Sequence, residues 1–433
     1  MSPTPASDPD PAPVPPSVPR SGAARVPGSV LVVGAGLAAT QTVAALREAG
    51  YAGRVVVLGA EGVPPYDRPP LSKHLLDRVE PAWLSDEVGT DVVALADDVH
   101  LDRPARGLVV THDAVTVRTG AGELTADALV VATGSSPVRP AAWDGAAVLH
   151  TAADAAALRA ALRPGDRLVV VGAGWVGAEV AGVAARAGVE VTVVEAASTP
   201  LTGALGATVG ALTVPWYDEH GVRLLTGRRV AAVDGDGVRL ADGEPLRADV
   251  VLAAVGSRPA TGWLGDALPR EGDGSLLVDE GFAVQGAPRH VRAVGDVVVR
   301  RSHRHCRVPG GHWDGALRDP GTLVADLLDP DAPEDVRAAR ADRAPYVFST
   351  QLGHDLTLFG QPAPADEVVL RGEPAGGGGW TALWYRPGTE TIAAVLTVDR
   401  PRDVGAARRL FTARDLPTLA RDLAADPTRP LRV

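Results

Sequence analysis

The sequence predicts an α/β protein with two Rossmann-like dinucleotide-binding domains and a C-terminal α+β domain, because one strand–turn–helix–strand signature occurs twice. In the first copy an apolar run at 30–33 leads into Gly34-Ala35-Gly36, a helical segment to Ala49 and a strand at 54–58. In the second, an apolar run at 167–171 leads into Gly172-Ala173-Gly174, a helix through Ala187 and a strand at 191–194. This unit places a dinucleotide diphosphate on the helix start, so two copies indicate two dinucleotides.

Composition limits the class of protein. The 433 residues, 45% of them hydrophobic, are enough for two or three domains. The 42 Lys and Arg against 53 Asp and Glu give a net charge of -11, which argues against nucleic acid or an anionic membrane as the main partner. A single cysteine, Cys306, excludes an intramolecular disulfide and a redox-active dithiol.

The N-terminal segment and the hydropathy pattern predict a cytoplasmic protein. No run of eighteen apolar residues occurs, and the first 28 residues lack the basic start and apolar middle of a secretion signal. Residues 1–28 are rich in Pro, Ser, Ala and Asp, a composition that buries too little apolar surface to offset the entropy of ordering. We therefore expect a disordered tail at 1–28.

Each position of the first signature has a role in dinucleotide binding. Gly34 makes the tight turn, Gly36 lets the backbone approach the diphosphate, and Ala39 is small where the helix meets the strand. Glu61, just beyond the second strand, is placed to accept a hydrogen bond from a ribose hydroxyl, at a spacing slightly longer than usual. The residues expected to bind the first dinucleotide here are Gly34, Gly36, Leu37, Ala38 and Glu61.

The second signature favours NADH. Glu195 ends its second strand, where it would accept hydrogen bonds from both adenosine ribose hydroxyls and repel a 2′-phosphate. Residues 196–199 offer no arginine for such a phosphate, so NADH is preferred over NADPH. The residues expected to bind the second dinucleotide in its turn, helix and strand are Gly172, Gly174, Trp175, Val176, Gly177 and Glu195.

Three further segments look like strands whose carboxyl ends face the ligands. Residues 128–134 end in Ala132-Thr133-Gly134, and a parallel segment at 250–256 ends in Gly256. Each is interpreted as the last strand of a nucleotide domain. A short strand at 290–295 is followed by Asp296, which could hold a ribityl or ribose hydroxyl or, equally, cap a helix.

Taken together, these motifs resemble the FAD-dependent ferredoxin reductases of bacterial oxygenase systems, of the putidaredoxin and rhodocoxin reductase type. These are also similar to the catalytic part of apoptosis-inducing factor. The most specific element is residues 65–73, with the sequence Pro-Tyr-Asp-Arg-Pro-Pro-Leu-Ser-Lys, and segments 312–317 and 345–353 match as well. The resemblance runs from Ser29 to the C-terminus and implies the two-domain flavoprotein fold of pyridine nucleotide-disulfide reductases.

The resemblance also implies roles for individual residues. Lys73 would approach the flavin N5 edge and Arg68 would lie against the FAD. Trp313, with His312 before it, would stack near the isoalloxazine, and Glu179 would lie near the nicotinamide carboxamide. The alternatives are a solvated surface loop for Lys73 and Arg68 and a core-filling Trp313. Glu179 could alternatively, or in addition, be a first-turn acid that complements the helix dipole.

The implied division is an FAD-binding domain at 29–140 and 257–335, an NAD-binding domain at 141–256 and a C-terminal interface domain at 336–433. Hydride would pass from NADH to FAD, and single electrons to a ferredoxin that serves an oxygenase. The chain would be a monomer or homodimer. The single cysteine excludes a flavin disulfide reductase, whereas a flavin monooxygenase and a redox-sensing flavoprotein are rival functions that the sequence leaves open.

Several residues depart from the family pattern on the side where electrons leave. Gly311 stands where the family commonly has an acid, Phe348 where it has a tryptophan and Thr350 where it has an acid. The densest basic run, Arg300 to Arg307, is a candidate surface for an acidic ferredoxin, with a solvated loop as the alternative.

Overall fold

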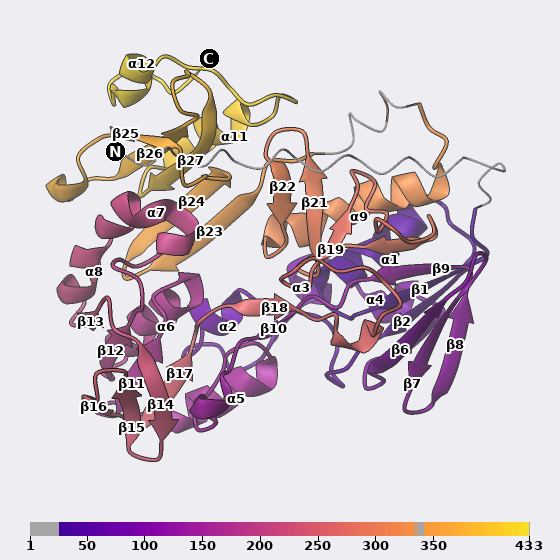
Figure 1. Cartoon of the computed structure of the whole chain (residues 1–433), viewed down its shortest axis with the longest axis horizontal. Coiled ribbons are helices and arrows are strands. Elements are labelled where there is room, and N and C mark those ends of the chain that lie inside the picture. Colours follow the sequence, from indigo (N-terminus) through magenta and orange to yellow (C-terminus); the bar gives the residue numbers. More distant parts are fainter. Residues whose placement is uncertain (1–25, 334–335, 337–341, 433) are drawn as a thin grey trace, which may run out of the picture.

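The computed structural model describes residues 26–333, 336 and 342–432 (Figure 1). The predicted disordered tail lies outside these residues except for its last three positions, 26–28. There the Pro27 carbonyl accepts a hydrogen bond from the Tyr51 hydroxyl at 2.8 Å, and the Gly28 N–H donates to Asp127 at 2.8 Å. Positions 27 and 28 are therefore bonded to the first domain.

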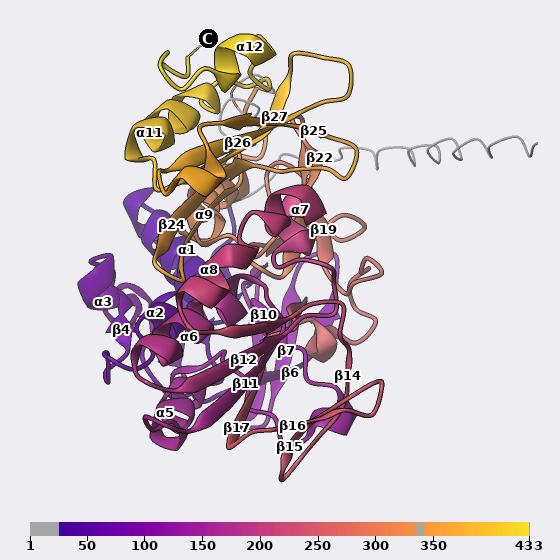
Figure 2. The same ribbon diagram turned by 90° about the vertical axis from the view of Figure 1, so that its left-hand side faces the viewer.

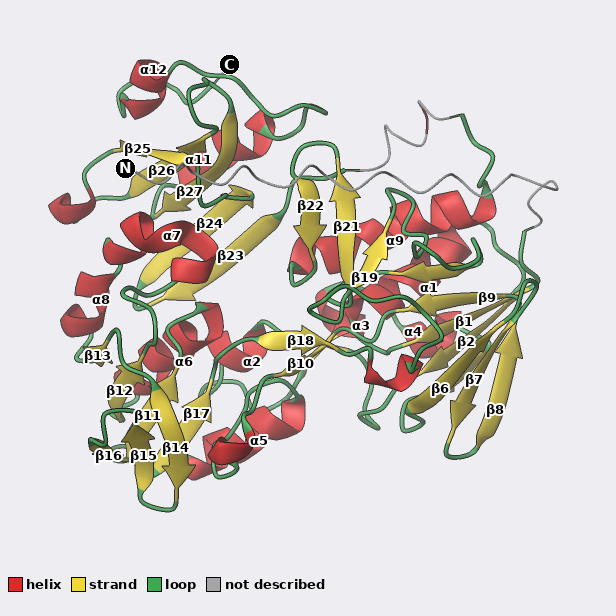
Figure 3. Ribbon diagram, in the orientation of Figure 1, coloured by secondary structure: helices red, strands yellow, loops and turns green. Residues whose placement is uncertain are grey.

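The first domain is built on a five-stranded parallel sheet of order β20-β9-β1-β2-β5. Its central strands are buried runs of Val, Leu and Ala, as expected for a parallel sheet covered on both faces. Helices α1 and α9 pack against each other, and the antiparallel sheet β6-β7-β8 contributes to the same hydrophobic core (Figure 3). The strands and helices named are β1 (Ser29–Val33), α1 (Leu37–Glu48), β2 (Arg54–Leu58), β5 (Asp98–His100), β6 (Ala105–Val110), β7 (Val115–Thr119), β8 (Gly122–Ala126), β9 (Ala128–Val131), β20 (Val291–Ala293) and α9 (Trp313–Leu328).

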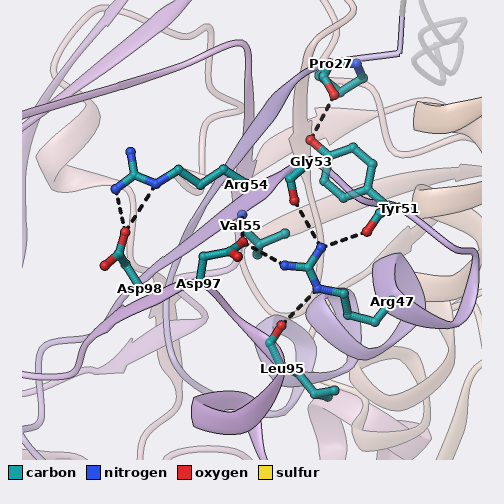
Figure 4. Close-up of polar contacts among 9 residues, drawn as sticks. All are labelled: Pro27, Arg47, Tyr51, Gly53, Arg54, Val55, Leu95, Asp97 and Asp98. Carbon is teal, nitrogen blue, oxygen red and sulfur yellow. Dashed lines mark hydrogen bonds and ion pairs between the residues drawn. The ribbon is translucent and has the colours of Figure 1, made fainter.

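Arg47, in the last turn of α1, fixes the helix to the strands that follow it (Figure 4). Its guanidinium donates to the carbonyls of Tyr51 at 2.7 Å and Leu95 at 2.9 Å, and to the Asp97 carboxylate at 2.7 Å. Asp97 also accepts from the Val55 N–H at 2.7 Å. One arginine thus locks the helix end to the starts of β2 and β5.

Short elements complete the first domain. A loop region after β2 holds β3 (Tyr66–Asp67), α2 (Pro70–Lys73), β4 (Ala82–Trp83), α3 (Leu84–Glu87) and α4 (Val92–Leu95). After the second domain come η2 (Gly262–Leu264), β19 (Leu276–Val278), β21 (Val298–Ser302) and β22 (Cys306–Pro309). The chain leaves the first domain through β10 (Ser135–Pro137) and returns through β18 (Ser257–Pro259), and these two strands pair with each other between the domains (Figure 1).

The second domain has a four-stranded parallel sheet of order β13-β12-β11-β17. Helix α6 contacts strands β11 and β12 of this sheet, and β14-β15-β16 form an antiparallel extension. The elements are η1 (Ala141–Trp143), α5 (Ala152–Ala161), β11 (Arg167–Val171), α6 (Trp175–Arg186), β12 (Glu190–Val194), α7 (Thr202–Ala211), α8 (Val214–Glu219), β13 (Arg223–Leu225), β14 (Val230–Asp234), β15 (Gly237–Leu240), β16 (Pro245–Arg247) and β17 (Val250–Ala253).

The third domain is a five-stranded antiparallel sheet of order β23-β24-β27-β26-β25 with helices α11 and α12. It stacks on the second domain (Figure 2). Leu352, Leu356, Trp380 and Trp384 share a core with residues of α6. Its elements are β23 (Tyr346–Gln351), β24 (His354–Gly360), β25 (Glu367–Arg371), η3 (Pro374–Gly376), β26 (Trp380–Tyr385), β27 (Ile392–Val398), α11 (Pro401–Leu410) and α12 (Arg421–Ala425). Among the described residues, none of the helices has the length and apolar character needed to cross a membrane.

Candidate active site at the junction of three domains

Both predicted fingerprint glycines make tight turns that only glycine can occupy. Gly34 has φ +120°, and a Cβ there would lie 2.1 Å from the Ala132 carbonyl oxygen. Gly172 has φ +105°, and its Cβ would lie 2.4 Å from the Ala254 carbonyl oxygen. Each turn is therefore pressed against the end of the neighbouring strand, β9 or β17, which brings Ala132 and Thr133 beside the first turn and Ala254 beside the second. Gly134 follows Thr133 directly in the chain, and Gly256 follows two residues after Ala254.

The helix starts that follow these turns are open. Gly36 and Gly174 are the N-caps of α1 and α6, and neither helix start has a side-chain capping bond. A Cβ built on either glycine meets nothing within 4 Å. The backbone N–H groups in the first helical turn of α1 and of α6 are thus left for an anionic ligand, which fits a dinucleotide diphosphate. The residues whose N–H groups lie there are Leu37 and Ala38 in α1, and Trp175 and Val176 in α6.

Gly177 fills the third fingerprint role in the second domain. A Cβ at Gly177 would lie 2.1 Å from the Gly172 carbonyl oxygen, so the helix contacts the turn backbone to backbone. In the first domain the corresponding small residue is Ala39, which is fully buried. The two folds therefore use glycine and alanine for the same close packing.

Glu195 lies at the mouth of the second turn. One carboxylate oxygen accepts from the Ala173 N–H at 2.7 Å and the other from the Ala197 N–H at 2.7 Å. Each oxygen keeps a further lone pair for a ribose hydroxyl. Arg228, which follows nearby, pairs with Asp242 at 2.6 Å and leaves Glu195 without a guanidinium partner among the described residues.

Glu61 lies in a polar cluster with Tyr66 and Arg68. It accepts hydrogen bonds at 2.5 Å from the Tyr66 hydroxyl and from the Arg68 guanidinium. Arg68 also donates to the His150 carbonyl, and the Tyr66 oxygen accepts from the Ala152 N–H at 2.9 Å. Burial raises the pKa of Tyr66 to about 12, so its hydroxyl stays protonated and donates. The cluster joins the 65–73 loop to the segment that leads into α5, and Arg68 is held by polar partners although its side chain is 38% exposed.

Asp296 lies in the turn between β20 and β21 and caps no helix among the described residues, so its interpretation as a helix cap is wrong. It accepts from the Ser135 hydroxyl at 3.3 Å and the Gly311 N–H at 3.1 Å. Next to it, a cavity at the start of α9 is lined by Gly311, His312 and Asp319 among others. The His312 Nδ1 atom is buried without a hydrogen-bond partner in the described part of the chain, and burial lowers the pKa of this histidine. A neutral imidazole with a free nitrogen beside Asp296 suits a polar ligand such as FAD.

The centre of the site is a buried ion pair between Lys73, at the end of α2, and Glu179, on α6. The Glu179 side chain is 4% exposed and that of Lys73 is 15% exposed. Glu179 also accepts from the Ser72 hydroxyl at 2.5 Å and from the Ser349 hydroxyl of β23. Glu179 lies beyond the first turn of α6, so its interpretation as a first-turn acid is wrong. The pair brings together the three domains at one point.

Aromatic side chains adjoin this pair. The Trp313 indole N–H donates to Asp67 at 2.6 Å, and burial raises the pKa of Asp67 while this bond opposes the rise. The Trp313 ring meets Phe348 edge-on at a centroid distance of 6.0 Å, and the Lys73 ammonium lies 5.2 Å from the Phe348 ring centroid. Trp313 is partly exposed and fixed by a polar bond, so it does not merely fill the core.

Comparison with known proteins explains this arrangement. The family model for pyridine nucleotide-disulphide oxidoreductases matches residues 28–316, and the family model for the reductase C-terminal domain matches residues 346–433. The ferredoxin–NAD(+) reductase component of the anthranilate 1,2-dioxygenase system of Burkholderia cepacia is 35% identical over 92% of this chain and 97% of its own length. The chain belongs to the ferredoxin reductases of this oxidoreductase family. The predicted fold class is thereby confirmed.

Solved structures agree with this assignment of the reductase. The crystal structure of Fdr9 is 39% identical, with a TM-score of 0.84, covering 94% of this chain and 99% of that one. The covalent putidaredoxin reductase–putidaredoxin complex is 27% identical, with a TM-score of 0.81 over 93% of this chain and 97% of that one. The reductase is an oxidoreductase with the family's cofactors, FAD and NAD(H), and its two open helix starts fit both.

Several arginines of the basic run of the reductase are held by contacts within the protein. Arg300 is buried and pairs with Asp342 at 2.8 Å, and Arg307 pairs with Glu271 at 2.5 Å. Arg304 donates to three backbone carbonyls between residues 411 and 414. The run forms the hairpin β21-β22, and Arg300 and Arg304 join it to the third domain. Arg301 and Arg307 are exposed, so docking of an acidic ferredoxin on this run stays a prediction.

Sequence reasoning missed several residues of the reductase site. Ser72 and Ser349 donate to Glu179, Gln351 donates to Ser349, and Asp67 holds Trp313. Residues 348–351 alternate between exposed and buried, but the apolar Phe348 points outward and the polar Ser349 and Gln351 inward, so the hydropathy pattern gave no signal for them. One departure is also compensated, because Thr350 donates at 2.8 Å to Asp355, the carboxylate opposite it on β24.

Proposed function

We propose that this reductase passes hydride from NADH to FAD and then single electrons to a ferredoxin that serves an oxygenase. The observation that carries the proposal is the Lys73–Glu179 pair, because each partner comes from a different nucleotide-binding domain. When bound, FAD accepts hydride from NADH and can release the two electrons one at a time. The chain's own residues bind, align and shield the reacting groups.

The residues divide this work by position. In the first domain, Lys73 supplies a positive charge at the junction, and Asp67 fixes the Trp313 ring beside it. In the second domain, Glu179 supplies a carboxylate that can accept a carboxamide N–H. Phe348 of the third domain packs against both Trp313 and Lys73 and limits the access of water to the pair.

Discrimination between nicotinamide cofactors rests on Glu195. Its oxygens are fixed by two backbone N–H groups, so the carboxylate cannot easily swing away from a 2′-phosphate. Because like charges repel and no arginine contacts Glu195 in the described part of the chain, we propose that NADH reacts faster than NADPH. We also propose that the enzyme works in the cytoplasm as a monomer or homodimer.

Stopped-flow spectroscopy tests the function. The purified protein, reconstituted with FAD, should be yellow, should bleach faster with NADH than with NADPH, and should then reduce one or more members of a ferredoxin panel. A Glu195→Gln variant should have a smaller ratio of the bleaching rate with NADH to the bleaching rate with NADPH. A colourless reconstituted protein, or a yellow one that NADH does not bleach, would overturn the proposal.

A further inference from the structure

The Glu179 carboxylate is held by donors from two other domains. Ser72 and Lys73 reach it from α2 of the first domain, and Ser349 reaches it from β23 of the third. Lys73 and Ser349 share the oxygen Oε1, whereas Ser72 binds Oε2 at 2.5 Å. Removing Ser349 would leave Oε1 with the lysine as its only side-chain donor among the described residues.

The direction of the Ser349 hydroxyl is set by Gln351, two residues along the same strand. The Gln351 side-chain N–H donates to the Ser349 oxygen at 3.1 Å. With its oxygen accepting from Gln351, the Ser349 hydroxyl hydrogen is free to point at the carboxylate. Both side chains are buried, at 3% and 2% exposure, so water does not compete for these bonds.

Two flexible side chains need this support. The last torsion of a glutamate is broad, and the lysine ammonium sits on a four-carbon stem without a preferred direction. The position of the ammonium therefore depends on where the carboxylate is fixed. On the outward side of the same strand, Phe348 contacts Lys73 and Trp313, so β23 supports the pair from both of its faces.

We propose that Ser349, oriented by Gln351, is a positioning residue that fixes Glu179 and through it Lys73, making the third domain part of the hydride-transfer site. The inference rests on the proposed function, because it assigns Glu179 and Lys73 to that reaction. It goes beyond it by giving the third domain a role on the nicotinamide side and not only on the side of the electron acceptor.

The test compares Ser349→Ala with Ser349→Thr, which keeps the hydroxyl, and with Thr350→Ala, a matched control at the exposed neighbour. Each FAD-loaded variant is measured for thermal stability, flavin reduction potential, NAD+ affinity by spectral titration, and the rate of bleaching at saturating NADH. Loss of one hydrogen bond to a charged group should slow bleaching by Ser349→Ala about tenfold. The same variant should bind NAD+ more weakly and have a lower flavin potential, because the ammonium is no longer held in place.

The expected pattern is partial recovery in Ser349→Thr, a smaller loss in Gln351→Leu, and Thr350→Ala within about twofold of the wild type, as for a surface change. A Ser349→Ala enzyme with wild-type potential, NAD+ affinity and bleaching rate would overturn the inference. A Glu179→Gln variant run in parallel separates the two levels. If Glu179→Gln is slow and Ser349→Ala is not, only the positioning role fails; if the wild type is not reduced by NADH, the proposed function fails.

Discussion

Replacing Arg300 by alanine should destabilise the protein far more than its place in a basic run suggests. The guanidinium is 5% exposed, donates to Asp342 at 2.8 Å and to the Arg343 carbonyl at 2.9 Å, and its partner carboxylate is 6% exposed. Removing one member of a buried ion pair leaves the other charge without its partner and costs about 3 to 5 kcal/mol. Arg301→Ala is the control, because Arg301 is exposed and contacts the Gln285 side chain at 3.1 Å.

Thermal unfolding of the FAD-bound variants measures this cost. At about 2 to 4 °C per kcal/mol for a domain of this size class, Arg300→Ala should melt at least about 6 °C below the wild type. The double variant Arg300→Met/Asp342→Leu should lose less than the sum of the two single changes, since neither charge is then left unpaired. Equal melting temperatures for Arg300→Ala and Arg301→Ala, or an additive double variant, would refute the reasoning.

Three other perturbations test the site and its pH dependence. Gly36→Ala should keep the fold, because the added Cβ meets nothing within 4 Å. It should lower the amount of bound FAD, measured as the ratio of visible to ultraviolet absorbance, because the Cβ occupies the space for the diphosphate, and an unchanged FAD content would contradict an open diphosphate site. Burial raises the pKa of Asp319 to about 6. The protonated carboxyl group therefore contributes to the free energy of unfolding at low pH, and this contribution is lost as pH rises through the pKa of the folded state. Between pH 4 and 7, the free energy of unfolding of Asp319→Asn, measured with urea, should rise by up to about 3 kcal/mol relative to that of the wild type. A difference between the two proteins that does not change with pH would refute this. Burial lowers the pKa of His305 to about 4. The stability that the neutral imidazole contributes above the pKa of the unfolded state is therefore lost as pH falls toward the pKa of the folded state. As pH falls from 7 to 4, the free energy of unfolding of His305→Leu should therefore rise by up to about 3 kcal/mol relative to that of the wild type. Unfolding free energies of the two proteins that change in parallel with pH would contradict this.

The nucleotide-binding parts of the fold could be predicted because their signals are local. Gly34 and Gly172 stand between an apolar run and a helical segment, and the structure gives both the positive φ that a tight turn requires. Such features need only a few neighbouring residues to be recognised. The return of the chain to the first domain was implied only by the family resemblance, because the carboxylate after the strand at 290–295 does not show which sheet that strand joins.

The rest depends on contacts between residues far apart in the chain. Arg304 finds its carbonyl acceptors more than a hundred residues later, so a count of nearby charges does not show which arginines of the run are already bonded within the protein. Ser349 and Glu179 are 170 residues apart, and nothing near either one indicates the other. Phe348 departs from the family pattern, but it keeps an aromatic contact with Trp313 that only the folded chain reveals.

Helix α6 explains why the third domain can control a carboxylate in the second. Gly182 follows Glu179 by three residues, close to one turn, so both face the same side of the helix. A Cβ on Gly182 would lie 3.0 Å from the Leu352 backbone nitrogen, which means that α6 and the end of β23 pack backbone to backbone. Because interiors this close transmit displacement and do not absorb it, a shift of β23 would move α6 with it. The hydrogen bond from Ser349 and this backbone contact therefore fix Glu179 to the same strand, once through its side chain and once through its helix.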